Sequence, residues 1–168
     1  MNVKAEKPTP KMGTASDGRP MHYSVGAIIT DEQGRFLLLD RRHEPYGFAG
    51  MAGHVDDGEE PADALMREGR EEIGVNLLYF QYVCEEEVPW NHCRSDGAHR
   101  IEVHYWHLYR ATVHSDNVTV DPREAKRWGW FTKDEIRSGW YERRGARHAL
   151  VLESAWVHWF KKVGILAA

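Results

Sequence analysis

Three glutamates in one short segment have the spacing needed to act together. Glu68, Glu71 and Glu72 stand at positions i, i+3 and i+4 between Pro61 and Gly74. On a helix they project from one face on consecutive turns, so their charges repel by about a few tenths of a kcal/mol per pair. A hard divalent cation, which prefers oxygen ligands, would turn this repulsion into binding. Composition alone favours a solvated helix face, so the wider pattern must decide between the two interpretations.

The helix that carries these glutamates is predicted to begin at Pro61 and to stop at Gly74, with acidic residues near its positive end. A different face of it is apolar, with Ala62, Leu65, Met66 and Ile73. This face is expected to pack inward, which places the carboxylates between core and solvent at the edge of a cleft. Gly69 costs about 1 kcal/mol against alanine in mid-helix. We therefore expect a neighbouring element to approach closely there.

The surrounding elements indicate an α/β layered domain, because strand and helix patterns are interleaved. A hairpin is predicted from 23–30 and 35–39, and a loop with four glycines follows at 47–58. The remaining predicted elements are strands at 77–88, 101–113 and 127–131, a short helix opened by a capping box at Thr132, and an amphipathic helix at 146–162.

Length and composition limit the function classes. The chain has 168 residues, 42% of them apolar, and a net charge of −4. The apolar content excludes wholesale disorder, and the mild acidity makes the chain a poor candidate for binding nucleic acid or an anionic membrane. The sequence contains no apolar run near the about 18 residues of a membrane span and no apolar signal core. We expect a polar, flexible tail at 1–20, a single domain at 21–168 and a cytoplasmic location.

Cysteine and histidine positions raise the question of zinc. Two cysteines, Cys84 and Cys93, make neither a disulfide framework nor a four-cysteine site. One polar loop and the next strand bring together His92, Cys93, His99, His104 and His107. Two histidines and a cysteine are able to bind zinc. The spacing matches no known zinc pattern, so scattered polar residues are the favoured interpretation.

The segment from Gly53 to Val75 resembles the Nudix box, G-x5-E-x7-R-E-U-x-E-E-x-G-U, where U is a bulky aliphatic residue. All fixed polar and glycine positions of the pattern are present, namely Gly53, Glu59, Arg67, Glu68, Glu71, Glu72 and Gly74. One aliphatic position departs from it, at Gly69. A match at seven fixed positions is far more specific than a lone glycine motif.

The resemblance implies an α-β-α sandwich with a mixed sheet and a loop–helix–loop catalytic element. It implies hydrolysis of a nucleoside diphosphate linked to another moiety, as in a nucleotide sugar, a dinucleotide or a nucleoside triphosphate, with Mg²⁺ or Mn²⁺. By family position, the metal ligands are Glu68, Glu71, Glu72 and the Gly53 carbonyl. Glu59 is then expected to pair with Arg67 and hold the loop on the helix, and Gly74 has a structural role.

Further residues are weighed around this box. The proton acceptor for the attacking water is expected to be Glu71 or, from outside the box, Glu124. Arg41 and Arg42 end a predicted strand and either bind substrate phosphates or are simply solvated. His54, in the loop, is expected to be a hydrogen-bonding group rather than a catalyst.

The expected partner is therefore a small nucleotide substrate, with a homodimer left open. Two alternatives remain: a nucleotide-sensing or protein-binding Nudix domain without turnover, and a relative similar to isopentenyl diphosphate isomerase. The complete glutamate set argues against both, since sensing modules usually lose box glutamates.

Overall fold

The computed structural model describes residues 9–93 and 100–168. Within these ranges the helices are α1 (Pro61–Ile73), α2 (Lys133–Ser138) and α3 (Ser154–Lys162), with a 3₁₀ turn η1 (Ser115–Asn117). The strands are β1 (Met12–Thr14), β2 (Pro20–Thr30), β3 (Phe36–Arg41), β4 (Phe48–Ala49), β5 (Met51–His54), β6 (Gln81–Val88), β7 (Val103–Thr112), β8 (Ala125–Phe131), β9 (Trp140–Arg143) and β10 (Ala146–Ala149).

The long strand β2 organises the sheet. β7 runs parallel along one edge of β2, from Met21↔Val103 to Thr30↔Thr112, and β6 continues antiparallel to β7. The other edge of β2 is shared by β1, β5 and β3, all antiparallel, and β3 is then flanked by β4 and β8. The sheet is therefore mixed, as expected.

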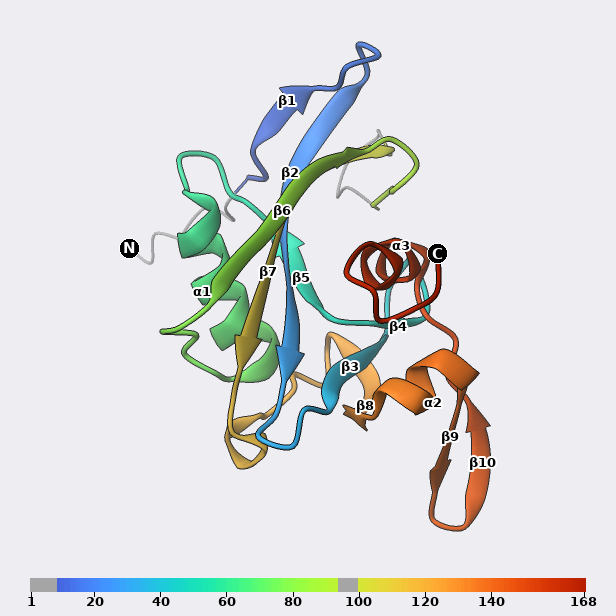
Figure 1. Cartoon of the computed structure of the whole chain (residues 1–168). Helices are drawn as coiled ribbons and strands as arrows, with labels where there is room; N and C mark the ends of the chain where they lie inside the picture. Colours follow the sequence, from blue (N-terminus) through green and yellow to red (C-terminus); the bar gives the residue numbers. More distant parts are fainter. Residues whose placement is uncertain (1–8, 94–99) are drawn as a thin grey trace.

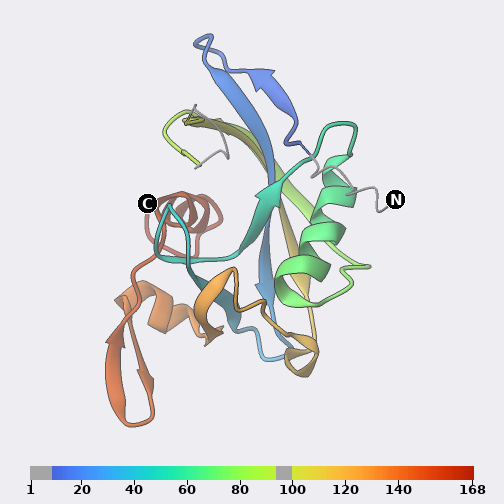
Figure 2. The ribbon, with the colours of Figure 1, turned by 180° about the vertical axis from the view of Figure 1, so that it is seen from behind.

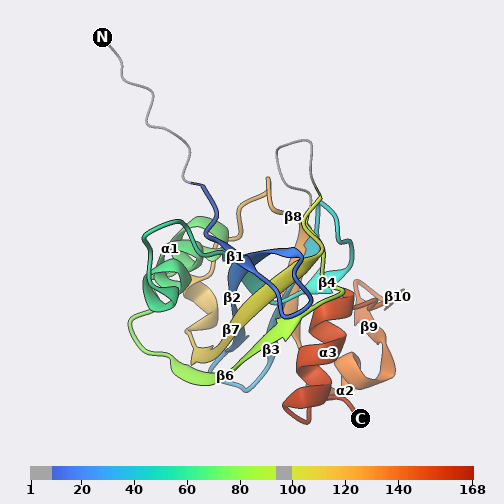
Figure 3. The same ribbon diagram turned by 90° about the horizontal axis from the view of Figure 1, so that it is seen from above.

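Two helices cover opposite faces of this sheet. Figures 1 and 3 show α1 on one side of the strands and α3 on the other. Alternation along β2 explains this arrangement, because successive side chains point to opposite faces. Val25, Ala27 and Ile29 pack into one core with the apolar face of α1, whereas Ile28 packs into a second core with Trp156 of α3. The predicted α-β-α sandwich is confirmed.

The C-terminal part of the chain differs from the prediction of one helix over 146–162. Residues 146–149 form β10, which pairs with β9 in a hairpin beyond α2 (Figures 1 and 2), and α3 begins only at Ser154. The reason is the turn between the strands, where Arg144 and Gly145 both have positive φ, 54° and 73°. This backbone favours a tight hairpin over a helix. The capping box at Thr132 is confirmed at the start of α2.

The described part of the predicted tail, residues 9–20, is not loose. β1 pairs with β2 through Met12↔His22 and Thr14↔Pro20, and Lys11 N donates to Val55 O at 2.8 Å. The pairing occupies an edge of β2 that would otherwise be exposed. The remainder of that predicted tail, 1–8, lies outside the described residues. Across the described ranges, no helix combines the length and apolar character needed to cross a membrane.

Candidate active site

The glutamate helix forms as predicted. α1 begins at Pro61 and ends at Ile73, and it is capped by Gly74, which has a left-handed φ of 67° and whose N–H donates to the Gly69 carbonyl. A methyl group at Gly69 would lie 3.0 Å from the Leu77 side chain. The expected close approach at this glycine is thus present, and it explains the departure from an aliphatic residue.

Arg67 ties the loop before the helix to the helix itself. Its guanidinium donates to both oxygens of Glu59, at 3.0 and 2.9 Å, and to the His54 carbonyl at 2.8 Å. Glu59 also accepts from Asp56 N at 3.0 Å. Burial acts to raise the pKa of Glu59, but the hydrogen bonds from Arg67 and Asp56 outweigh it and lower that pKa. The expected Glu59–Arg67 pair is present.

The three predicted metal ligands lie close together but face different partners. Arg67 Nη1 contacts Glu68 Oε1 at 2.7 Å and Glu71 Oε2 at 3.3 Å, whereas Glu72 Oε2 accepts from Ala52 N at 3.2 Å. Burial raises the pKa of Glu68 to about 7 and raises that of Glu72 well above its usual range. Two desolvated carboxylates beside each other form a donor set suited to a hard divalent cation.

Gly53 gives the carboxylates access to the backbone. A methyl group at this position would overlap the Glu68 carboxyl group. Gly53 lies on β5 opposite Val25 of β2, so the sheet fixes its position against α1. A cradle that only glycine leaves open, next to the carboxylate, fits the predicted contribution of the Gly53 carbonyl to a metal site.

These groups open into a cavity of about 690 Å³. Its lining includes all three helix glutamates together with Arg41, His43, Gly50, Ala52, Gly53, His54, Asp121, Arg123 and Glu124. Glu124, one of the two candidate proton acceptors, thus lines the same cavity as the helix glutamates. The Arg41 Nε atom is buried and has no hydrogen-bond partner within the described residues. Because Arg41 also lines the cavity, its guanidinium places a positive charge there beside the carboxylates.

Arg42 and the 121–124 loop show what sequence reasoning missed. Arg42 is exposed, donates from Nε to the Pro122 carbonyl at 2.9 Å and does not line the cavity. Of the two predicted substrate-binding arginines, only Arg41 therefore lies at the site. Asp121 was not predicted, yet it lines the cavity and its N–H donates to the Glu72 carbonyl at 2.9 Å. A sequence signal for Asp121 was lacking, because its place depends on a contact between distant segments.

Comparisons with known proteins show which family the chain resembles. The family model for the NUDIX domain matches residues 20–153. An NAD-capped RNA hydrolase of Stutzerimonas stutzeri is 29% identical over 120 residues, 68% of this chain and 40% of that protein. An RNA pyrophosphohydrolase of Novosphingobium aromaticivorans is 27% identical over 138 residues, 74% of this chain and 86% of that protein. The chain thus spans about two fifths of the first relative and most of the second.

A solved structure shares the fold. The MutT protein from Methanosarcina mazei Go1 superposes with a TM-score of 0.64 at 21% identity, covering 86% of this chain and 93% of that one. The family match covers well over half of the chain and includes the whole box from Gly53 to Val75. The chain therefore belongs to the Nudix family.

Proposed function

We propose that the protein is a Mg²⁺- or Mn²⁺-dependent pyrophosphohydrolase that cleaves a phosphoanhydride bond in a nucleoside diphosphate linked to another moiety. One observation carries the proposal: the helix glutamates, Glu124 and Arg41 all line the same cavity. Carboxylates suit a cation and the guanidinium suits a phosphate oxygen, so one cavity holds both groups that a pyrophosphate substrate requires.

The metal would be held by Glu68, Glu71 and Glu72 with the Gly53 carbonyl. When bound, it neutralises charge on phosphate oxygens and lowers the pKa of an attacking water. No described cation besides Arg67 contacts these carboxylates directly, and Arg67 is already shared with Glu59. A bound divalent ion would favour the charged forms of Glu68 and Glu72, against the burial that raises their pKa values.

The chain's own residues supply the remaining functions. Arg41 orients the substrate by donating to a phosphate oxygen, and Glu71 or Glu124 accepts the proton from the attacking water. Both carboxylates line the cavity and both are exposed to solvent. Arg67 and Glu59 are positioning residues, because they hold the loop that presents Gly53 rather than facing the cavity.

The net charge of the chain ranks the candidate substrate classes. The names of both relatives specify RNA substrates, whereas this chain carries a net charge of −4, which disfavours a polyanion. Small nucleotides are therefore the first candidates, and RNA carrying a 5′ NAD or a 5′ triphosphate is the second.

A substrate panel tests the proposal. The full chain is incubated with Mg²⁺ or Mn²⁺ and ADP-ribose, NADH, diadenosine polyphosphates, nucleotide sugars, nucleoside triphosphates, or the two RNAs. We expect metal-dependent release of a mononucleotide from a small substrate, and the ranking of kcat/KM identifies the class. If the protein binds a nucleotide but hydrolyses no compound in the panel, the result would support the sensing alternative and contradict the proposal.

A further inference from the structure

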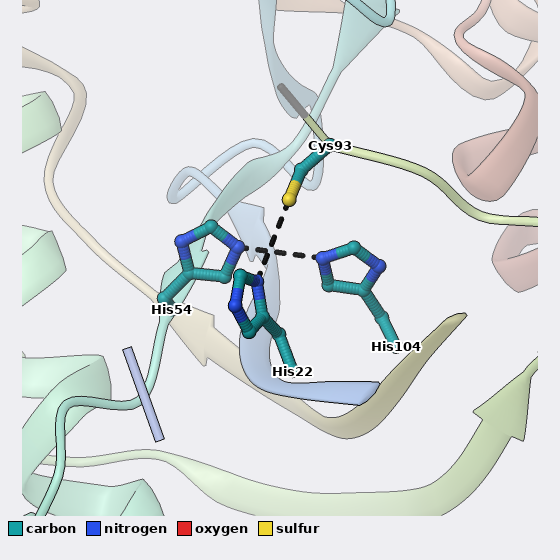
Figure 4. Close-up of side chains that lie close together, drawn as sticks. All are labelled: His22, His54, Cys93 and His104. Atoms are coloured by element: carbon teal, nitrogen blue, oxygen red, sulfur yellow. Dashed lines mark hydrogen bonds between the residues drawn. The ribbon is translucent and has the colours of Figure 1, made fainter. Parts of the chain in front are cut away.

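Four side chains of the metal-binding types meet on the side of β5 away from α1. They are His22, His54, Cys93 and His104, and one potential ligand atom from each lies within 4.8 Å of the other three. Figure 4 shows the three rings and the thiol directed toward a common centre. His22 and His104 are buried, and the other two are half-buried.

Strand register brings the histidines together. His22 on β2 lies directly beside His104 on β7 in the parallel pairing. His54 on β5 is opposite Ser24, two residues along β2 and hence on the same face as His22. Three adjacent strands therefore present three imidazoles side by side, an arrangement that no local spacing reveals.

Cys93 completes the cluster from the connection between β6 and β7. Its N–H donates to the Ile101 carbonyl at 2.9 Å in an isolated bridge, so the backbone at Cys93 is joined to the residues leading into β7. The Cys93 Sγ atom lies 3.5 Å from Nδ1 of His22. The two cysteines of the chain are not joined by a disulfide, since Cys84 lies on β6 outside the cluster.

Hydrogen bonding prepares His104 as a ligand. Its Nδ1 lies 2.8 Å from the backbone carbonyl of Asn91, which requires the proton on Nδ1 and directs Nε2 into the cluster. A backbone carbonyl on the far nitrogen is the usual support of a metal-bound histidine.

The observed separations match the edges of a zinc tetrahedron. Zn–N bonds of about 2.0–2.1 Å and a Zn–S bond of about 2.3 Å put two nitrogens about 3.3–3.4 Å apart, and nitrogen and sulfur about 3.5–3.6 Å apart. The Nε2 atoms of His54 and His104 are 3.3 Å apart, and the Cys93–His22 separation is 3.5 Å. All four ligand atoms lie within 4.8 Å of one another, so side-chain shifts of about 1 Å would bring the remaining pairs to the separations of a zinc tetrahedron.

We propose that His22, His54, Cys93 and His104 bind one Zn²⁺ ion in a tetrahedral site separate from the carboxylate site. Imidazole nitrogens and a thiolate favour zinc over Mg²⁺, whereas the carboxylates on α1 have the opposite preference. Gly53 and His54 are consecutive on β5, and consecutive residues face opposite sides of the sheet. Gly53 thus faces Glu68, and His54 faces the cluster.

The site has a structural role in this proposal, because four protein ligands leave no open position for a substrate or water. The ion would join three strands of the sheet to the connection that carries Cys93. A small cavity links the two regions: its lining includes His54, Cys93 and His104 together with Arg41 and Gly53, which also line the active-site cavity. Zinc would therefore fix one wall of the active-site region.

Metal analysis and cobalt spectroscopy of the full chain test this site. After growth with zinc, we expect about one equivalent of tightly held Zn²⁺ per chain by elemental analysis. After its removal with a chelator, titration with Co²⁺ should give the absorption of a tetrahedral thiolate-bound ion. Cys93→Ser and His104→Gln should each weaken zinc binding by about 100-fold or more, in competition with a chelating dye.

Matched variants separate the site from its surroundings. Cys84→Ser changes the other cysteine, and His107→Gln changes a histidine on β7 that contacts Glu85 at 3.2 Å instead of the cluster. Both should keep full zinc content. The thiolate absorption in Cys84→Ser can come only from Cys93, so this test stands even where Cys93→Ser fails to fold. Glu72→Gln should also keep its zinc, since it belongs to the other site.

Two results would overturn the assignment. One is wild-type protein without bound zinc that also fails to take up Co²⁺ with a thiolate absorption. The other is equal zinc affinity in Cys93→Ser, His104→Gln and the wild type. Either would leave the cluster as a set of hydrogen-bonded imidazoles, without affecting the proposed hydrolase.

Discussion

At the scale of single residues, the Glu68 carboxyl group lies so close to Gly53 that no side chain fits at that position. Glycine is part of the family pattern at this position, and packing also requires it, because a methyl group would occupy the space of the carboxylate. The position therefore tests whether the geometry of α1 against β5 controls activity.

Gly53→Ala should displace the Glu68 carboxylate, lower the free energy of unfolding by about 1–3 kcal/mol and reduce the metal-dependent rate. Chemical denaturation and kcat/KM for the best substrate measure both effects. The matched control is Gly129→Ala, where a methyl group would meet its nearest neighbour at 3.4 Å, an ordinary contact, so a change within about 0.5 kcal/mol is expected. Equal behaviour of the two variants would contradict the cradle.

The charge of the helix glutamates is the second test at this scale. Glu72→Gln and Glu71→Gln keep side-chain shape but remove a metal ligand, so the rate should fall by about 100-fold or more while the circular dichroism spectrum is unchanged. Glu142→Gln, an exposed change on β9 outside the cavity, should keep the wild-type rate. Full activity in both helix variants would show that the metal ligands are assigned wrongly.

The junction of loop and helix decides function at the scale of elements. Arg67 binds the loop through Glu59 and the His54 carbonyl, and its Nη1 binds Glu68 and Glu71 of the helix. One planar guanidinium makes all these contacts, and a lysine ammonium cannot reproduce the paired geometry.

Arg67→Lys should therefore lower the free energy of unfolding by about 1.5–3 kcal/mol and reduce kcat, because Gly53 is held less firmly. Urea denaturation and steady-state kinetics provide the measurements. Arg70→Lys is the control on the same helix, since Arg70 is exposed and its guanidinium donates to Asn76 Oδ1 at 3.3 Å. If both variants match the wild type, the junction does not need the guanidinium.

For the whole molecule, the second core holds α3 against the sheet. Trp156 is 1% exposed and packs with Trp106 of β7 and Phe160 of its own helix. A methyl group at Gly50 would overlap its ring, so the tryptophan also contacts the loop that leads into β5. Stability and the site are thereby coupled through one side chain.

Trp156→Ala should lower the free energy of unfolding by about 3–5 kcal/mol, since it leaves a cavity in this core. Trp140, 45% exposed on β9 and stacked on Arg147, is the control, and Trp140→Ala should cost about 1 kcal/mol or less. The denaturant midpoints of the two variants, measured where their m-values are equal, compare their losses of stability. A small effect at Trp156 would mean that α3 is not a stabilising layer.

Much of the fold and the box was predictable because both follow local rules. The start, the end and the polar face of α1 can be read from Pro61, Gly74 and the glutamates at i, i+3 and i+4. The capping box at Thr132 likewise marks the start of α2. The C-terminal helix was misplaced because the helical spacing continued into a segment where Arg144 and Gly145 turn the chain. The prediction for residues 9–20 was wrong because β1 is ordered by pairing with β2, and β2 lies outside the local sequence pattern of the tail.

The amino-acid sequence alone determined the box, the charge of the site and the layered class, since each depends on residue type and short-range spacing. Only the tertiary structure decided which distant residues share a site. It separated Arg41 from Arg42, brought Asp121 to the cavity and joined His22 and His54 to Cys93 and His104. The physical reason is contact between distant segments, for the histidines through strand register, which places residues far apart in the chain a few ångströms apart in space and has no signature in any one segment.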